Sequence, residues 1–114
     1  MPHIIIEYAE SAVDKTQVAF MLQAIHHSVS DSGLFESSHI KTRANPFTQF
    51  THAGGDDPYI HVQARIKSGR NAENKQRLGS EILAGLSTLN IPVTVITVEI
   101  IDMDRDSYSK WTQK

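Results

Sequence analysis

The chain has 114 residues, a formal net charge of −2 and a sequence pI of about 6.3. A charge so near balance argues against the broad basic surface with which proteins bind nucleic acid. The chain lacks cysteine, which excludes disulfides and thiolate chemistry and allows a reducing compartment. There is no signal-peptide pattern after Met1 and no apolar run near the roughly 20 residues of a membrane helix. We therefore expect one cytoplasmic domain, residues 1–114, with no membrane partner.

The first half of the chain predicts a strand, a helix and a second strand. Residues 2–8 are apolar and rich in isoleucine, as a short buried strand is. Asp14 stands at the N-cap position of the following helix, and Gln17 completes the spacing of a capping box. The helix runs to about residue 30, before Gly33, and has an apolar face of Val18, Met21, Leu22, Ile25 and Val29. Residues 39–44 predict the second strand.

The second half repeats this order after a loop. Residues 45–58 are rich in Asn, Pro, Gly and Asp, which favour turns. The alternating segment 59–67 predicts a third strand, and Asn71 is the candidate cap of a second helix. That helix ends at residues 90–92 and has an apolar face of Leu78, Ile82, Leu86 and Leu89.

The chain ends in a fourth predicted strand and a polar tail. Residues 93–101 are almost entirely β-branched and apolar, which is typical of a strand. The tail from 102 to 114 is polar, and its two large aromatic residues, Tyr108 and Trp111, are the candidate anchors of this segment.

Two successive strand–helix–strand units predict an α+β fold. Such units make right-handed parallel crossovers, so two of them give a four-stranded mixed sheet with both helices on one face. The last strand has apolar residues at neighbouring positions, as strands covered on both faces do: Val95, Ile96, Val98, Ile100 and Ile101. Because one chain leaves the second sheet face open, we expect another copy of the chain to cover it.

Pro2 has the sharpest chemical implication. Cellular processing removes an initiator methionine that precedes a small residue, which leaves the secondary amine of proline at the start of a buried strand. An α-amino group titrates at about 7.7–8.0, and an apolar pocket or nearby cations lower its pKa. The neutral amine is then a general base. A chain that retains Met1 has no such amine and is expected to be inactive by this mechanism. Most Met-Pro starts carry no function.

Three cations could accompany this amine. Lys41 and Arg43 stand two apart on a predicted strand and so share a face, and Arg70 lies in the turn before the second helix. A guanidinium binds carboxylate in a bidentate fork, whereas lysine acts as a point charge. Three such groups near the end of an apolar strand suit a small di- or tricarboxylate substrate. The alternative for each of them is a solvated surface position.

The six histidines form no recognisable metal motif. None of them is paired at the i,i+4 spacing of a helical zinc site, and HExxH is absent. A Gly-rich phosphate loop and a nucleophile elbow are also missing. Asp56 and Asp57 lie in a Gly-rich loop, where they favour turn formation over an acid pair. We therefore expect no metal and no organic cofactor.

A family resemblance rests on three segments: MPHIIIEY at 1–8, GLFESSHIKTR at 33–43 and SGRNAENKQRLGSEIL at 68–83. Together they resemble 5-carboxymethyl-2-hydroxymuconate Δ-isomerase, of the tautomerase superfamily. The resemblance implies a tautomerase- and MIF-like homotrimer with sheets inside a ring of helices. It also implies aromatic-compound catabolism, in which a hydroxydienoate from meta-cleavage is isomerised by proton transfer through the proline amine.

The resemblance also assigns residues. Pro2 matches the catalytic proline, Arg70 the arginine of the Gly-Arg turn, and Arg43 the second basic residue of the strand after Gly-Leu-Phe. Lys41 stands where the family has arginine, so the charge is kept but the bidentate fork is lost. In a trimer, a neighbouring subunit could supply some of these cations.

Two other functions fit the sequence. One is a tautomerase of the same superfamily that acts on a different keto or enol acid. The other is a non-catalytic ferredoxin-like binding module, which has the same order of elements and no use for a proline amine. An RNA-recognition version is disfavoured, because the third strand, YIHVQARIK, lacks an aromatic stacking pattern.

Overall fold

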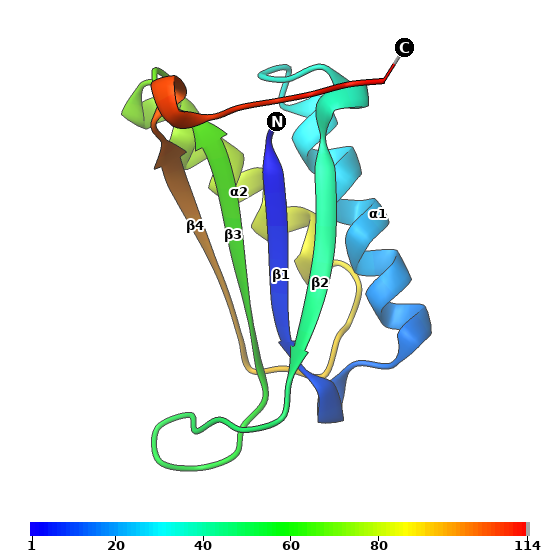
Figure 1. The fold of residues 1–114 in the computed structure, drawn as a ribbon. Coiled ribbons are helices and arrows are strands. Elements are labelled where there is room, and N and C mark those ends of the chain that lie inside the picture. The colour runs from blue at the N-terminus through cyan, green and yellow to red at the C-terminus, as the bar shows by residue number, and fades with distance from the viewer. Residues whose placement is uncertain (114) are drawn as a thin grey trace.

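The computed structural model describes residues 1–113 as one sheet with two helices on a single face (Figure 1). Its elements are β1 (His3–Ala9), α1 (Lys15–Asp31), β2 (Lys41–Phe47), β3 (Tyr59–Lys67), α2 (Ala72–Ser87) and β4 (Val95–Met103). The strand order is β2-β1-β3-β4. β1 pairs parallel with β2 and antiparallel with β3, and β3 pairs parallel with β4, which confirms the predicted α+β fold with a mixed sheet.

Both helices begin where their caps predict. The side chain of Asp14 accepts from the backbone N–H of Gln17 at 2.8 Å, and the Gln17 side chain accepts from the Asp14 N–H at 2.9 Å, so the capping box is complete. Asn71 likewise caps α2 by accepting from the N–H of Asn74 at 2.8 Å. No helix in residues 1–113 is long and apolar enough to cross a membrane.

The second strand departs most from its predicted bounds. It begins at Lys41, because Ser37–His39 form a short 3-10 turn, and it continues to Phe47 through residues expected to be loop. Pro46 is tolerated because β2 is an edge strand, where a nitrogen without hydrogen can face away from the ladder. The last strand is Val95–Met103 rather than 93–101, since it pairs with β3 as far as Lys67.

The core lies between the sheet and the helices. Each helix buries three large apolar residues, and β1 and β3 bury every second residue beneath them. The fully buried apolar residues are Pro2, Ile4, Ile6, Ala9, Met21, Ile25, Val29, Ile60, Val62, Ala64, Ile66, Leu78, Ile82 and Leu86. Val18 and Leu22, expected on the buried face of α1, are only partly buried at its margins, with Met21 at the centre.

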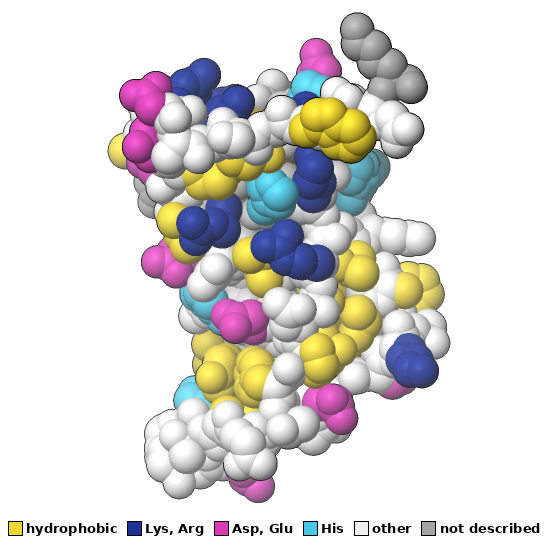
Figure 2. All heavy atoms as spheres, in the orientation of Figure 1, with side chains coloured by type: hydrophobic (Ala, Val, Ile, Leu, Met, Phe, Trp, Pro, Cys, Tyr) yellow, Lys and Arg dark blue, Asp and Glu magenta, His cyan; other side chains and the backbone are white. Residues whose placement is uncertain are grey.

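The opposite sheet face is open and mixed in character. Ile5, Val95 and Ile101 point to it, so the neighbouring apolar residues of β4 do divide between the two faces. Polar residues stand between them, namely His3, Glu7, Lys41, Arg43, Asn45, His61, Gln63, Arg65, Lys67, Thr97 and Glu99. Figure 2 shows that the basic side chains gather over the end of this face where the N-terminus lies (Figure 1). The face is therefore less apolar than expected.

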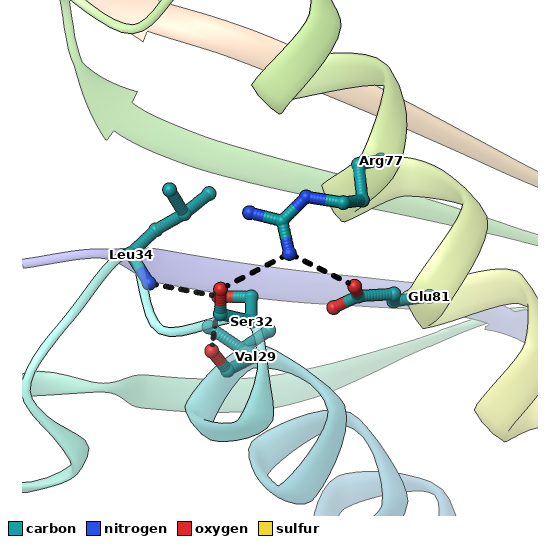
Figure 3. A network of polar contacts seen from close by, with 5 residues as sticks. All are labelled: Val29, Ser32, Leu34, Arg77 and Glu81. Carbon is teal, nitrogen blue, oxygen red and sulfur yellow. Dashed lines mark hydrogen bonds and ion pairs between the residues drawn. The ribbon is translucent and has the colours of Figure 1, made fainter.

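The end of α1 is fastened to α2 by the network in Figure 3. Arg77 of α2 donates to the Ser32 carbonyl at 3.2 Å and to Glu81 at 3.3 Å. The Ser32 hydroxyl donates to the Val29 carbonyl at 2.6 Å and accepts from the Leu34 N–H at 3.3 Å. These contacts fix the turn after α1, which carries one wall of the pocket described next.

Candidate active site

A pocket of about 290 Å³ opens at the end of the sheet where β1 begins. Its lining joins the N-terminus, the turn after α1, the segment after β3 and the C-terminal segment: Met1, Leu34, Phe35, Glu36, His39, Lys67, Arg70, Tyr108 and Lys110. Figure 1 shows the C-terminal segment crossing this end of the strands, above the N-terminus. The pocket thus combines three cations, two aromatic rings and the start of the buried central strand.

Pro2 is fully buried and follows Met1, which lines this pocket. Its carbonyl accepts from the backbone N–H of Lys41 at 3.0 Å, which continues the pairing of β1 with β2. Met1 precedes it and lines the pocket, with its sulfur accepting from the N–H of Lys67 at 3.3 Å. Met1 is therefore the residue that connects the buried Pro2 with the pocket.

The N-terminal amine lies in a positively charged setting. The Met1 amine and the Lys41 ammonium both donate to the carbonyl of His39, each at 3.2 Å. Burial is the main cause that lowers the pKa of the Met1 amine from 8.0 to about 6. The hydrogen bond and repulsion from Lys41 add to this, followed by repulsion from Lys110 and Lys67. An amine at this position is therefore largely neutral at pH 7 and able to accept a proton.

Arg70 lines the pocket with a fixed guanidinium. One of its nitrogens donates to the Leu34 carbonyl at 2.8 Å, and its Cζ atom lies over the Phe35 ring at 4.8 Å from the ring centre. Both contacts come from the turn that Arg77 holds, so the arginine is oriented before any ligand arrives. Its remaining N–H groups suit a carboxylate.

Arg43 lies on the open sheet face and is not among the lining residues of the pocket. Its guanidinium reaches the Nδ1 atom of His3 at 3.4 Å. The other ring nitrogen of His3 is 3.0 Å from the hydroxyl of Tyr108, which does line the pocket. Arg43 is thus linked to the pocket through His3.

The sequence could not place the C-terminal segment. Arg105 donates to the carbonyl of Ser68 at 2.9 Å, which brings Tyr108 and Lys110 over the pocket. Tyr108 is an anchor, as predicted, since Lys67 lies over its ring at 5.2 Å from the centre. The same expectation for Trp111 is wrong within one chain, because this side chain is 81% exposed.

A larger hollow, of about 490 Å³, lies between the end of α2 and β4. None of its lining residues is titratable: Leu83, Ala84, Leu86, Ser87, Asn90, Ile91, Val93, Thr94, Val95 and Ile96. It cannot move protons and is not the chemical site, although it is the larger of the two. Within residues 1–113, no three His, Cys, Asp or Glu side chains cluster as a metal site.

Comparison with protein families decides the family of the chain. A family model described as 5-carboxymethyl-2-hydroxymuconate isomerase matches residues 2–107. The chain belongs to this isomerase family. As a member of it, the protein is an enzyme that rearranges its substrate, and the ferredoxin-like binding module is a different family.

Similar proteins agree with this assignment. The 5-carboxymethyl-2-hydroxymuconate Delta-isomerase of Escherichia coli is 22% identical over 90 residues, which cover 77% of this chain and 71% of that protein. The structure of a 5-carboxymethyl-2-hydroxymuconate isomerase from Deinococcus radiodurans R1 has a TM-score of 0.82 at 19% identity. The match covers 98% of this chain and 90% of that one. The structure of a fused 4-OT asymmetric trimer has a TM-score of 0.85 at 13% identity, and the match covers 97% of this chain and 94% of that one. These two structures show the shared fold.

In this isomerase, the four residues selected from the sequence do not form a single cluster. Arg70 lines the pocket, and Pro2 is buried next to Met1, which also lines it. Lys41 reaches the carbonyl of His39, a lining residue, and Arg43 is linked to the lining residue Tyr108 through His3. Sequence reasoning missed Lys67 and Lys110 as further cations of the pocket. Lys67 could have been selected from the sequence, because it ends β3, the strand that pairs with β1. Lys110 could not, because its position depends on the path of the C-terminal segment.

Proposed function

We propose that this isomerase moves a proton and a double bond in a carboxylated 2-hydroxydienoate such as 5-carboxymethyl-2-hydroxymuconate, with the Pro2 amine as its acid–base group. The observation that carries the proposal is the position of Pro2: it is buried at the start of a central strand, next to the Met1 that lines a pocket with three cations. The proposal requires that Met1 be removed, because a peptide nitrogen is not a base.

The surroundings of Met1 support a neutral proline amine. Burial and Lys41 lower the pKa of the Met1 amine to about 6, and the nitrogen of Pro2 is one residue away in the same surroundings. Proline fixes its own ring, so the lone pair of the amine has a constant direction. Removal of Met1 also enlarges the space that a substrate can occupy.

The reaction balances with a single base. Neutral Pro2 takes the proton of the 2-hydroxyl group, and the electron pair spreads along the conjugated chain as a dienolate. The protonated amine returns the proton to the far carbon, which leaves a 2-keto acid with its double bond moved. No oxidant, metal or cofactor enters this balance.

The cations bind and stabilise the anionic substrate. Arg70 offers guanidinium N–H groups to one carboxylate, and Lys41 places a point charge beside the amine. Arg43 adds positive charge from the open sheet face. Charges held in place before the reaction stabilise the dienolate more than they stabilise the substrate, which is how they raise the rate. In a homotrimer, a neighbouring subunit completes this set.

The substrate class is tested with a panel of acids. Dienols of the 2-hydroxymuconate type and phenylpyruvate are compared by kcat/KM. A preference for dicarboxylates supports the proposal. A preference for a monocarboxylate instead favours a tautomerase of another keto or enol acid, which the loss of the fork at Lys41 would explain.

The proline mechanism is tested at the N-terminus. Mass spectrometry of the purified enzyme is expected to show Met1 removed, and Pro2→Ala is expected to lower kcat by about 10²-fold or more with unchanged circular dichroism. Pro92→Ala, a proline in the segment before β4, is the matched control and keeps full activity. Full activity in a chain that retains Met1, or in Pro2→Ala, overturns the mechanism.

A further inference from the structure

Three side chains form a chain of contacts from the open sheet face to the pocket. Arg43 of β2 lies 3.4 Å from Nδ1 of His3, and Nε2 of His3 lies 3.0 Å from the hydroxyl of Tyr108. The rings of His3 and Tyr108 meet edge to face, with centres 5.9 Å apart. The positive charge that Arg43 adds in the proposed function does not account for this arrangement.

The direction of these hydrogen bonds follows from the chemistry of the groups. A guanidinium only donates, so Nδ1 of His3 must accept from Arg43 and carries no hydrogen. A neutral imidazole then has its hydrogen on Nε2, which donates to the oxygen of Tyr108. The hydroxyl of Tyr108 has received its hydrogen bond and keeps its own hydrogen free to donate.

The surroundings keep the imidazole neutral. Burial is the first cause that lowers the pKa of His3, followed by repulsion from the N-terminal amine in its protonated form and from Arg43, Lys41 and Arg65. These groups reach the ring from the chain start, from β2 and from β3. Tyr108 faces it from the C-terminal segment. A protonated ring would direct an N–H at the Arg43 guanidinium, so the neutral form also suits the contact.

Tyr108 is held in place independently of any ligand. Arg105, three residues before it, is tied to Ser68, and the side chain of Asp104 caps the same short turn. The Lys67 ammonium lies over the Tyr108 ring at 5.2 Å. The ring is therefore fixed on two sides, and its residue forms part of the pocket lining.

We propose that Tyr108 is a further catalytic residue, which donates its hydroxyl hydrogen to the 2-oxygen of the substrate as that oxygen becomes negative. His3 and Arg43 are its positioning residues in this step: Arg43 sets the tautomer of His3, and His3 sets the direction of the hydrogen bond to Tyr108. This inference rests on the proposed dienolate reaction and adds the group that meets its charge. A donor aimed at developing charge acts mainly on kcat.

The first test removes only the hydroxyl. Tyr108→Phe keeps the ring, and with it the contact to Lys67, and is expected to lower kcat by about 10²-fold with little change in KM. Tyr59→Phe is the matched control, because Tyr59 begins β3 at the end of the strand away from the pocket residue Lys67. This variant is expected to retain full kcat. An unchanged kcat in Tyr108→Phe overturns the inference.

The second test observes the histidine directly, without an activity assay. Nitrogen-15 NMR of the purified enzyme is expected to show the hydrogen of His3 on Nε2 at neutral pH. His3→Gln, whose amide can still donate to Tyr108, is expected to retain more kcat than His3→Ala. A hydrogen found on Nδ1 overturns the assignment, because Tyr108 would then donate to His3 and not to substrate.

The two proposals fail in different ways. If Pro2→Ala abolishes turnover and Tyr108→Phe does not, only the role of Tyr108 is wrong. If Pro2→Ala retains full turnover, the proline mechanism is wrong, and the inference that rests on it falls as well. Loss of turnover in both variants, with the Nε2 tautomer present, supports both.

Discussion

At the scale of single residues, the site depends on groups whose pKa is shifted by their neighbours. The amine of Met1 and the imidazole of His3 are both partly buried among positive charges, and both have a lowered pKa. Arg70 is different, because its role depends on its orientation, which a carbonyl and a ring fix. Proton transfer and anion binding are therefore assigned to separate groups.

The lowered pKa of the amine predicts a pH effect in a chain that retains Met1. The folded amine loses its proton near pH 6, whereas the unfolded amine does so near 8.0. Between these values the unfolded state binds more protons, so this contribution to stability grows as the pH rises from about 6 to 8 and is lost as the pH falls from 8 to 6. The rate of acylation of this amine, followed by mass spectrometry of the N-terminal peptide, is expected to reach half its maximum near pH 6.

The same chain unfolded in urea is the control for that measurement. Its amine has no burial and no fixed neighbours, so the midpoint of acylation is expected near 8.0. Equal midpoints in the folded and unfolded chains would show that the amine is not in the setting described.

Single residues could be selected from the sequence only where the neighbouring residues indicate a specific chemistry. Pro2 follows the initiator, and Arg70 stands at a Gly-Arg turn before a helix cap, so both were found in the sequence. Tyr108 was selected only as an anchor, and its link to His3 joins positions 105 residues apart. No local pattern encodes such a contact, because it depends on where the tail crosses the strands.

At the scale of elements, caps and periodicity predicted the helices better than the edge strands. Asp14 and Asn71 mark the helix starts by satisfying free backbone N–H groups, and that chemistry is local. β2 contains Asn45 and Pro46, which favour a turn when considered alone. Pairing with β1 outweighs this preference, and the sequence contains no local sign of that pairing.

The contact between α1 and α2 gives a prediction for stability. A Cβ atom on Gly85 would clash with the hydroxyl of Ser28 on the facing helix. Gly85→Ala is therefore expected to destabilise the protein by about 1 kcal/mol, since the Ser28 hydroxyl must rotate away. In a Ser28→Ala background, the same change is expected to stabilise by about 0.5–1 kcal/mol, because alanine favours a helix.

Urea unfolding of the four proteins measures this cycle. The two effects of Gly85→Ala are expected to differ in sign, which reports the coupling between residues in contact. An equal effect in both backgrounds would mean that Ser28 does not limit the approach of the helices. A third helix substitution, Ala84→Gly, is the control for propensity alone and destabilises equally with and without Ser28.

At the scale of the whole molecule, the open sheet face is the feature that one chain leaves unfinished. Helices cover one face only (Figure 1), while Ile5, Val95 and Ile101 point to the other. We propose that copies of the chain pack these faces together as a homotrimer. The mixed polarity of the face (Figure 2) suits such an interface, where polar groups pair between copies instead of meeting water.

The variant Ile101→Lys tests whether the open sheet face forms the trimer interface. Ile101 lies opposite Arg65, so Ile101→Lys adds a positive charge that Arg65 repels and cannot pair with. Buried in an interface, that lysine would be desolvated and unpaired, which destabilises the assembly. Light scattering is expected to give three times the 12.7 kDa chain mass for the unmodified protein and the mass of one chain for Ile101→Lys.

The outer face of α1 provides the matched control. Phe20 is 55% exposed there, and Phe20→Lys makes a similar change on the helix side of the molecule. It is expected to leave the trimer intact, because the sheet faces and not the helices meet in the proposed assembly. A dimer in the unmodified protein contradicts the trimer. If Phe20→Lys separates the chains while Ile101→Lys does not, the helices form the interface, and the open sheet face has another role.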